Sequence, residues 1–245
     1  MVDNIVVLPT YNERENIEPL ISMLLELPVA LGVVVVDDHS PDGTGDLAGR
    51  LAMEYPERVA VIHRPGKLGL GTAYLAGFEH ALAQGALRIL TMDADFSHHP
   101  RYVPAMIQAN QQTYDLVIGS RYVPGGGTPD FPLRRRVLSR GANAFARFML
   151  GLGARDTTAG FRCYRRRVIE ALPLGSIFSN GYSFLIEMLF LVQQAGFTVG
   201  EIPIVFEDRK RGKSKISQQE ITRAFYTVFR LAWRRLFGHD PAFMV

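Results

Sequence analysis

Short apolar runs alternate with amphipathic stretches along the first half of the chain. Four consecutive valines, at residues 33–36, are typical of a parallel strand covered on both faces. Similar runs occupy residues 5–8, 59–63, 86–92 and 116–119. Between them, apolar side chains recur at helical spacing, which predicts helices from Asn12 or Glu13 to residue 25 and over residues 46–55, 69–83 and 102–111. This alternation predicts an α/β fold with an open, mostly parallel sheet and helices on both faces.

The pattern changes after residue 121. A glycine-rich loop at residues 125–127 leads to expected helices over 139–150 and 183–195, a strand over 198–206, a cationic loop over 208–217 and a terminal helix over 220–237. Because no linker composition separates these parts, we expect one domain over residues 1–245, divided into portions 1–121, 122–220 and 221–245.

Polar side chains follow several of the predicted strands. They are Tyr11, Asp37 with Asp38, Asp93 with Asp95, and Ser120 with Arg121. Ligands of open α/β sheets bind outside the carboxyl ends of the strands, so we expect these residues to gather in one cleft.

The pair Asp93 and Asp95 is the sharpest candidate for metal chemistry. Mg²⁺ and Mn²⁺ prefer oxygen ligands and commonly bridge to a diphosphate. A solvated, Asp-rich turn is the alternative, and His98 with His99 lacks the further ligands that a zinc site needs. Asp38 suits a ribose hydroxyl or a base edge, although Asp37 and Asp38 could equally approach a helix N-terminus.

The glycine-rich segment at residues 66–72 (GKLGLGT) fits neither a Walker loop nor a dinucleotide-binding fingerprint. It lacks the Lys-Ser/Thr pair of the former, and Tyr74 stands where the latter has its third glycine. A dehydrogenase is therefore disfavoured, and a loop close to a phosphate or sugar is the simpler interpretation.

Charge is distributed unevenly along the chain. Residues 1–100 carry 14 acidic and 6 basic side chains, whereas residues 101–245 carry 10 acidic and 21 basic ones. Residues 134–167 alone contain ten arginines, and a guanidinium binds phosphate as a fork. The acidic first half and the lack of an aromatic platform argue against nucleic acid as a partner.

Composition excludes several further classes. The hydrophobic content of 47% fits a folded chain rather than a disordered one. The single cysteine, Cys163, excludes an intrachain disulfide and favours a reducing compartment. No run of about 18 apolar residues predicts a transmembrane helix, and no signal peptide is apparent at residues 1–4 (MVDN).

The terminal helix is amphipathic. Ile221, Phe225, Val228, Ala232 and Leu236 share one face, and three arginines share the opposite face, with Trp233 near the boundary. Such a helix can lie on an anionic membrane, but packing of its apolar face on the domain is the slightly favoured interpretation.

Several segments together resemble a known family. They are residues 8–13 (LPTYNE), 36–44 (VDDHSPDGT), 67–74 (KLGLGTAY), 92–100 (MDADFSHHP), 119–122 (GSRY), 139–143 (SRGAN), 158–162 (TAGFR), 208–209 (DR) and 212–215 (GKSK). In this order they are similar to family 2 glycosyltransferases and, more narrowly, to dolichyl-phosphate (polyprenyl-phosphate) mannosyltransferases.

The resemblance implies a GT-A type nucleotide-sugar-binding fold with GDP-mannose as donor and Mg²⁺ or Mn²⁺ as cofactor. Portion 1–121 becomes the donor half and portion 122–220 the acceptor half. The residues implied at the guanosine end are Pro9, Tyr11, Glu13, Val36 and Asp38. Those implied at the metal, ribose and diphosphate are Asp93, Ala94 and Asp95, with Ser97 standing where other members carry a metal-shell Gln.

The basic residues have implied roles as well. Arg121, Arg209 and Lys215 would contact the donor phosphates or sugar. Arg135 falls near the position that binds the acceptor phosphate in the family. Because the glycine loop before it shifts the alignment by one or two residues, Arg134, Arg136 and Arg140 are candidates for the same role. Asp95, Arg121, Arg135 and Arg209 form the expected catalytic set.

The implied reaction is inverting transfer of mannose to a polyprenyl (dolichyl) phosphate, which needs no general base because the acceptor is already an anion. The expected location is cytoplasmic and peripheral, on the cytoplasmic face of a membrane, through basic surfaces or a membrane partner protein. Two alternatives stay open: a polyprenyl-phosphate glucosyltransferase that uses UDP-glucose, and a non-catalytic nucleotide-sugar-binding subunit.

Overall fold

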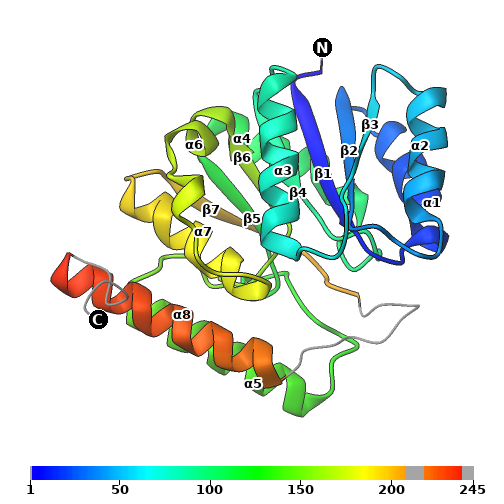
Figure 1. Cartoon of the computed structure of the whole chain (residues 1–245). Coiled ribbons are helices and arrows are strands. Elements are labelled where there is room, and N and C mark those ends of the chain that lie inside the picture. Colours follow the sequence, from blue (N-terminus) through cyan, green and yellow to red (C-terminus); the bar gives the residue numbers. More distant parts are fainter. Residues whose placement is uncertain (1, 208–217, 239–245) are drawn as a thin grey trace.

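The computed structural model describes residues 2–207 and 218–238, and within them one twisted sheet forms the centre of the molecule (Figure 1). Its strands lie in the order β3-β2-β1-β4-β6-β5-β7. They are β1 (Asn4–Thr10), β2 (Leu31–Asp37), β3 (Val59–His63), β4 (Arg88–Thr91), β5 (Leu116–Ser120), β6 (Arg162–Arg165) and β7 (Val199–Pro203). β6 runs antiparallel to its neighbours β4 and β5, and the remaining pairs are parallel. The prediction of a mostly parallel sheet is thus confirmed.

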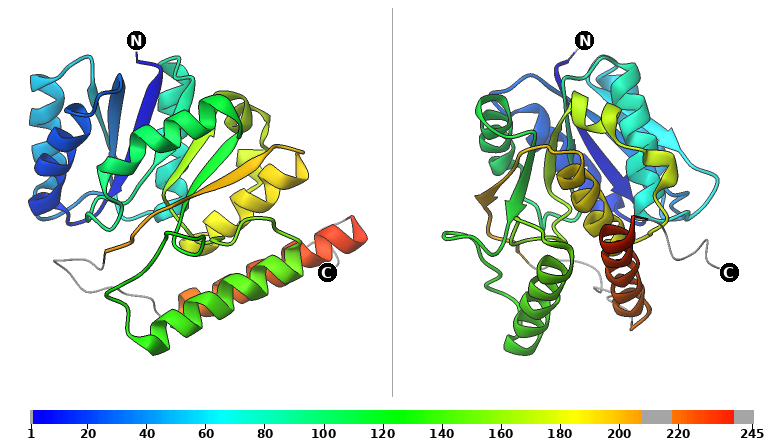
Figure 2. Two further views of the ribbon diagram at one scale, coloured as in Figure 1. Left: turned by 180° about the vertical axis from the view of Figure 1, so that it is seen from behind. Right: turned by 90° about the vertical axis from the view of Figure 1, so that its left-hand side faces the viewer.

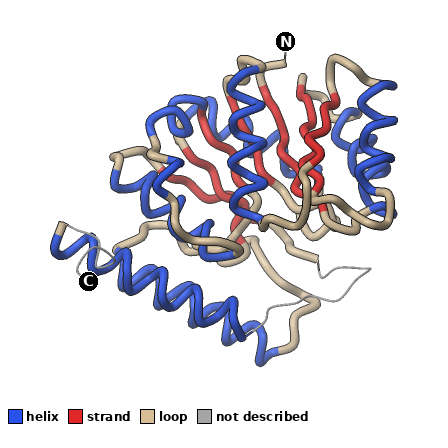
Figure 3. Tube along the Cα trace, viewed as in Figure 1, coloured by secondary structure: helices blue, strands red, loops and turns tan. Residues whose placement is uncertain are grey.

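Helices cover both faces of the sheet (Figure 3). They are α1 (Arg14–Leu25), α2 (Thr44–Glu54), α3 (Leu70–Ala83), α4 (Val103–Gln112), α5 (Leu133–Leu150), α6 (Arg166–Ala171), α7 (Tyr182–Gln194) and α8 (Gln218–Phe237), with short 3₁₀ turns η1 (Pro100–Tyr102) and η2 (Leu174–Ser176). Successive strand residues point to opposite faces. Val6 and Leu8 of β1 therefore pack in the core that includes α1, α2 and α4, and Ile5 and Val7 pack in the core that includes α3 and α7.

Two long helices lie apart from the sheet, beyond the carboxyl ends of its parallel strands (Figures 1 and 2). α5 and α8 run side by side, and Phe145 of α5 meets Phe225 and Phe229 of α8 at ring-centroid distances of 5.1 and 5.8 Å. Along the stretches that the structure describes, no helix is both long and apolar enough to cross a bilayer.

Three elements differ from expectation. β6 and α6 were not predicted, because the strand has arginine at both ends and so has no apolar run. Arg162 nevertheless lies wholly buried, where its Nε and Nη2 donate to the carbonyls of Ala159 and Thr157 at 2.8 and 3.0 Å. α5 begins six residues before the predicted 139 because three arginines in its first turns hide the apolar pattern.

The terminal helix buries a different stripe from the predicted one. Thr227, Val228, Leu231 and Ala232 are buried, whereas Phe225 and Leu236 are 47% and 76% exposed. α8 therefore has a second apolar face, and packing on the domain accounts for only part of its hydrophobic surface.

Candidate active site

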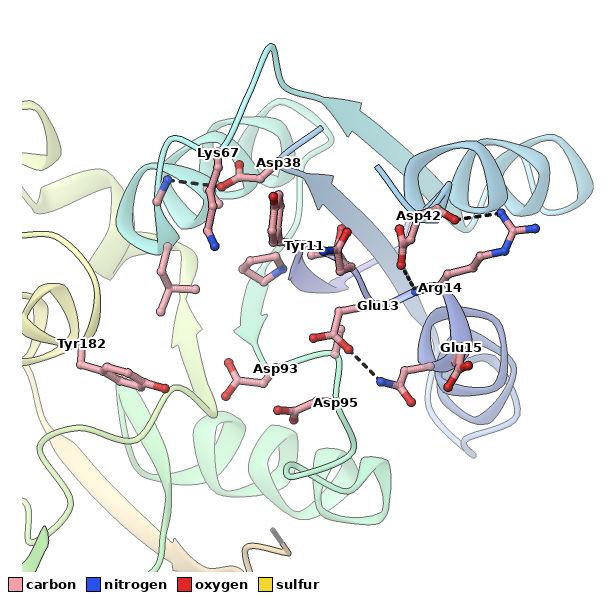
Figure 4. A pocket seen from close by; sticks show the side chains of 18 residues that line it. Tyr11, Glu13, Arg14, Glu15, Asp38, Asp42, Lys67, Asp93, Asp95 and Tyr182 are labelled. Carbon is pink, nitrogen blue, oxygen red and sulfur yellow. Dashed lines mark hydrogen bonds between the residues drawn. The ribbon is translucent and has the colours of Figure 1, made fainter. Parts of the chain in front are cut away.

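The carboxyl ends of β1, β2 and β4 surround a cavity of about 700 Å³ (Figure 4). Pro9 lies near the end of β1, and Tyr11 and Glu13 follow this strand. Asp38 follows β2, and the Asp93–Asp95 segment follows β4; all line the cavity. The sequence-based expectation that strand ends meet in one cleft is therefore confirmed for Tyr11, Asp38, Asp93 and Asp95. Three of the expected residues do not line this cavity, namely Asp37, Ser120 and Arg121.

The loop that carries the two aspartates is tightly organised. Asp95 is 5% exposed, and its Oδ1 accepts hydrogen bonds from the backbone N–H and the hydroxyl of Ser97 at 3.0 and 2.6 Å. The N–H of Asp93 donates to Nδ1 of His98 at 3.0 Å. Phe96 between them has φ +64°, a left-handed conformation that bulky residues adopt rarely. This turn directs both carboxylates toward the cavity (Figure 4).

The buried side chain of His98 packs beneath the loop that carries the two aspartates and accepts a hydrogen bond from it. Its ring stacks on Phe161 at 5.1 Å and meets Phe206 edge-on at 5.4 Å. Burial lowers the pKa of His98 and outweighs the opposing effect of Asp93 and Asp95. The neutral imidazole is the form that can accept the Asp93 N–H at Nδ1, so His98 serves as a structural acceptor rather than as a zinc ligand.

The donor set of the cavity suits a hard divalent cation. Asp93 and Asp95 offer carboxylate oxygens one residue apart, which Mg²⁺ and Mn²⁺ favour. Within residues 2–207 and 218–238, no group of three or more His, Cys, Asp or Glu side chains is placed to hold a metal ion by itself. The remaining ligands would come from water and a bound diphosphate. The hydroxyl of Ser97 is engaged with Asp95, so its metal-ligand role stays a prediction.

Asp38 is fixed at the opposite end of the cavity. Its Oδ1 accepts from Arg64 Nη1 at 2.5 Å, and its Oδ2 accepts from the N–H of Gly69 at 3.2 Å. Arg64 also donates to Thr72 Oγ1 at 2.6 Å. The glycine-rich segment is therefore tied to Asp38, which explains how a stretch that fits no phosphate-loop pattern still shapes the cavity.

The other residues implied at the guanosine end differ in whether they line the cavity. Glu13 lines the cavity and accepts from Asn16 Nδ2 at 2.7 Å. The Tyr11 ring lies 4.0 Å below the ammonium of Lys67, which also lines the cavity. Val36 is wholly buried within β2 and is not among the lining residues. A direct contact between its side chain and a ligand in this cavity is therefore not supported.

The comparisons with known proteins agree with this geometry. The sequence model of Glycosyl transferase family 2 matches residues 5–172. The chain belongs to this family. It is 46% identical over 224 residues to polyprenol monophosphomannose synthase of Mycolicibacterium smegmatis, covering 91% of this chain and 84% of the relative. It is 42% identical over 226 residues to undecaprenyl-phosphate mannosyltransferase of Micrococcus luteus, covering 92% of each.

Solved structures confirm the GT-A type fold of this glycosyltransferase. Glucosyl-3-phosphoglycerate synthase of Mycobacterium tuberculosis with Mn²⁺, UDP and phosphoglyceric acid superposes with a TM-score of 0.65 at 21% identity, over 98% of this chain and 80% of that one. The same enzyme with Mg²⁺ and UDP gives a TM-score of 0.63 at 21% identity, over 96% and 79%. At this identity the likeness concerns the fold.

The predicted arginines of this glycosyltransferase are dispersed rather than gathered. Arg121 follows β5, but its side chain is 11% exposed, pairs with Asp156 at 2.7 Å and does not line the described cavity. Arg135 lies 3.6 Å from the centre of the Phe131 ring. Arg136 and Arg140 line a second cavity of about 340 Å³. Arg209 and Lys215 lie outside the described residues, so their roles stay predictions.

The cavity also has lining residues that were not predicted as site residues. Arg14, Asp42, Lys67 and Tyr182 line the cavity beside the expected set. Arg14 and Asp42 interact with each other, since the N–H of Arg14 donates to Asp42 Oδ2 at 3.1 Å. Tyr182 opens α7, more than 80 residues after Asp95, and faces the aspartates across the cavity (Figure 4). Only the tertiary structure brings Tyr182 to the cavity. Lys67, in contrast, belongs to the glycine-rich segment at residues 66–72, which the sequence had already indicated as a loop close to a ligand.

Proposed function

We propose that this glycosyltransferase transfers mannose from GDP-mannose to a polyprenyl phosphate, with inversion at the anomeric carbon and with Mg²⁺ or Mn²⁺ as cofactor. The observation that carries the proposal is the pair of relatives at 46% and 42% identity, both of which are named for attaching mannose to a polyprenyl carrier. Their alignments extend over more than nine-tenths of this chain, so they include both the donor cavity and α5.

The cavity supports a nucleotide-sugar donor. Asp38 and Tyr11 offer a carboxylate and an aromatic face at one end, which suit a guanosine. Asp93 and Asp95 would hold the cation at the other end. When bound there, the cation neutralises charge on the leaving diphosphate. Lys67, which reaches into the cavity between these ends (Figure 4), adds a cation of the protein's own.

The acceptor needs little chemical activation. A polyprenyl phosphate is ionised near neutral pH, so its oxygen attacks the anomeric carbon without a general base. The protein then contributes by holding the two anions in line and stabilising the developing charge. The arginines of α5, together with Arg121, are the proposed source of this cationic environment. Direct in-line attack on an α-linked donor gives a β-linked mannosyl phosphate.

Access to a lipid acceptor is supported by the surface of α5 and α8. On α5, Leu133, Val137 and Phe148 are 73%, 63% and 86% exposed. On α8, the exposed large side chains are Phe225, Tyr226, Phe229, Trp233, Leu236 and Phe237. We call these nine side chains the α5–α8 apolar face. Arginines flank it on both helices, and aromatic residues beside basic ones favour the interface of an anionic membrane. The enzyme is therefore proposed to bind membranes peripherally.

Transfer of label to lipid tests the proposal. Purified protein is incubated with GDP-[³H]mannose, Mn²⁺ and a short polyprenyl phosphate, and label is counted in the organic phase. Parallel reactions contain UDP-[³H]glucose or contain EDTA in place of Mn²⁺. Label in lipid from GDP-mannose alone, lost with EDTA, is the expected result. Transfer from UDP-glucose instead would replace the donor, and binding of GDP-mannose without transfer in any reaction would favour a non-catalytic subunit.

A further inference from the structure

Tyr74 of α3 places a buried hydroxyl behind the aspartate loop. Its ring stacks between Phe78 and Phe184 at centroid distances of 6.3 and 6.0 Å, and the whole side chain is inaccessible to solvent. Among the described residues, its hydroxyl has no hydrogen-bond partner. Leaving a buried hydroxyl unsatisfied destabilises a fold. A phenylalanine would fill the same space without this penalty, so the hydroxyl calls for an explanation.

The hydroxyl shares a small space with Asp93. A Cβ placed on Gly160 would lie 3.3 Å from the Tyr74 hydroxyl and 3.5 Å from Asp93 Oδ1. Both oxygens therefore face one point, which is open because residue 160 is glycine. The position of Gly160 is fixed, since its carbonyl accepts from Thr91 Oγ1 at 2.6 Å at the end of β4. The other carboxylate oxygen, Asp93 Oδ2, lies on the His98 side, 3.8 Å from Nδ1.

The phenol remains a hydrogen-bond donor at working pH. Burial raises the pKa of Tyr74 well above 10, and the charge of Asp93 raises it further. A neutral phenol beside a carboxylate has one favourable arrangement, in which its O–H points at a carboxylate oxygen. The Asp93 side chain is 26% exposed, and such a hydrogen bond requires it to rotate toward the Tyr74 hydroxyl.

We propose that Tyr74 is a positioning residue, which donates its hydroxyl hydrogen to Asp93 Oδ1 when the carboxylate binds a divalent cation. This inference rests on the proposed metal-dependent donor site. A hydrogen bond to a carboxylate that would hold the cation fixes the orientation of that carboxylate, and loss of such outer contacts typically weakens metal binding by about 10- to 100-fold. The cost of the unsatisfied hydroxyl in the metal-free protein is then offset in the loaded one.

The test is Tyr74→Phe, with Tyr164→Phe as the matched control. Tyr164 is also buried and packs edge-on against Phe78 at 5.5 Å, but its hydroxyl accepts from Arg162 Nη1 at 3.3 Å. Mn²⁺ affinity in the presence of GDP is measured by the EPR signal of the free ion, and the melting temperature is measured in EDTA. Tyr74→Phe is expected to raise the Mn²⁺ Kd about tenfold and to melt at the same or a higher temperature. Tyr164→Phe is expected to melt lower with an unchanged Kd.

A second variant checks the shared space. Gly160→Ala puts a methyl group between the two oxygens, and residue 160 has no positive φ that would forbid alanine. It is expected to weaken Mn²⁺ binding as Tyr74→Phe does, and the double variant is expected to be no weaker than either single one.

The outcomes are separable from those of the proposed function. If wild-type protein binds Mn²⁺ with GDP and transfers mannose while Tyr74→Phe binds Mn²⁺ equally well, the positioning role is overturned and the function stands. A lower melting temperature or loss of folding for Tyr74→Phe in EDTA would reveal a structural partner for the hydroxyl and would also overturn it. Failure of the wild-type protein to bind Mn²⁺ would remove both.

Discussion

Arg121 and Asp156 form a buried, two-pronged ion pair. Nε and Nη2 of Arg121 donate to Oδ2 and Oδ1 of Asp156, each at 2.7 Å. Asp156 is itself held because its backbone N–H and that of Arg155 donate to the carboxylate of Glu201 on β7 at 2.9 and 2.7 Å. The guanidinium after β5 is thus fixed from a second strand, and its predicted role toward phosphate depends on that pair.

Removing Asp156 should cost stability and activity together. Asp156→Asn leaves the buried guanidinium without its counter-charge, which typically destabilises by about 3–5 kcal/mol. We expect urea denaturation to show a loss in this range and mannosyl transfer to fall, since Arg121 is no longer held. Glu170→Gln is the control, because Glu170 pairs with Arg166 at the surface and such pairs contribute about 0–1 kcal/mol. Equal losses in the two variants would contradict the importance of the buried pair.

The same pair predicts a dependence of stability on pH. Burial alone would raise the pKa of Asp156, but the charge and hydrogen bonds of Arg121 outweigh it and lower this pKa below 3.8. A carboxyl whose pKa is lowered in the folded state stabilises the fold above its unfolded pKa and loses that contribution in more acidic solution. The free energy of unfolding should therefore decline below about pH 4. Asp156→Asn should decline less steeply, and parallel acid profiles would count against the assignment.

Asp95 should be required for transfer but dispensable for folding. Asp95→Asn keeps the shape and the hydrogen bond from Ser97 but removes the charge that suits a divalent cation. We expect transfer from GDP-mannose to fall by about 100-fold or more, with a melting temperature close to that of the wild type. The matched control is Asp46→Asn, an exposed aspartate in the first turn of α2. An Asp95→Asn variant that turns over at the wild-type rate would rule out the proposed catalytic role.

The strand ends of the site could be predicted from the sequence because they depend on local patterns. Apolar runs locate the strands, and the parallel sheet then brings Tyr11, Asp38 and Asp95 to one edge. This argument did not concern Val36, whose role at the guanosine end was implied by the family resemblance alone. In a strand covered on both faces every side chain enters a core, and the Val36 side chain is accordingly buried and does not line the cavity.

Pairings across long sequence distances could not be predicted in the same way. No local pattern tells that Arg121 is held by Asp156, or that Tyr182 crosses the cavity to face the aspartates. The prediction of which face of α8 is buried was incomplete for another reason. A helical wheel shows which residues share a face, but only the packing of α7 and α5 decides that Val228 is buried while Phe225 is exposed.

Glu187 should make the protein less stable as the pH rises above the ordinary pKa of a glutamate side chain. It is buried in α7, where its Oε2 accepts from the N–H of Ser179 at 3.0 Å and from the Ser179 hydroxyl. Burial raises the pKa of Glu187 more than these hydrogen bonds lower it. An acid whose pKa is raised in the folded state favours folding below its unfolded pKa, near 4.3, and this contribution is lost as pH rises through the folded value.

Glu187→Gln tests this prediction. The amide keeps an acceptor for Ser179 and cannot ionise, so the variant should be more stable than the wild type at pH 8. The two proteins should converge toward pH 4. Glu170→Gln serves as the control, since the Glu170 side chain is 47% exposed. A Glu187→Gln variant that is less stable at pH 8 would show that the carboxylate is ionised and stabilising.

Membrane binding should depend on the α5–α8 apolar face and on little else. Phe148→Glu and Leu236→Glu each place a negative charge on this face, at side chains that are 86% and 76% exposed, so neither should disturb the fold. Each variant loses a large apolar side chain that would insert at the membrane interface, and its new carboxylate is repelled by anionic lipid. Sedimentation with phosphatidylglycerol vesicles should show about tenfold weaker binding for each. Met53→Glu, on α2 and 76% exposed, carries the same charge change away from the face and should bind as the wild type does. If all three variants lose binding alike, net charge rather than this face governs attachment; if none does, the enzyme reaches its lipid through a membrane partner protein.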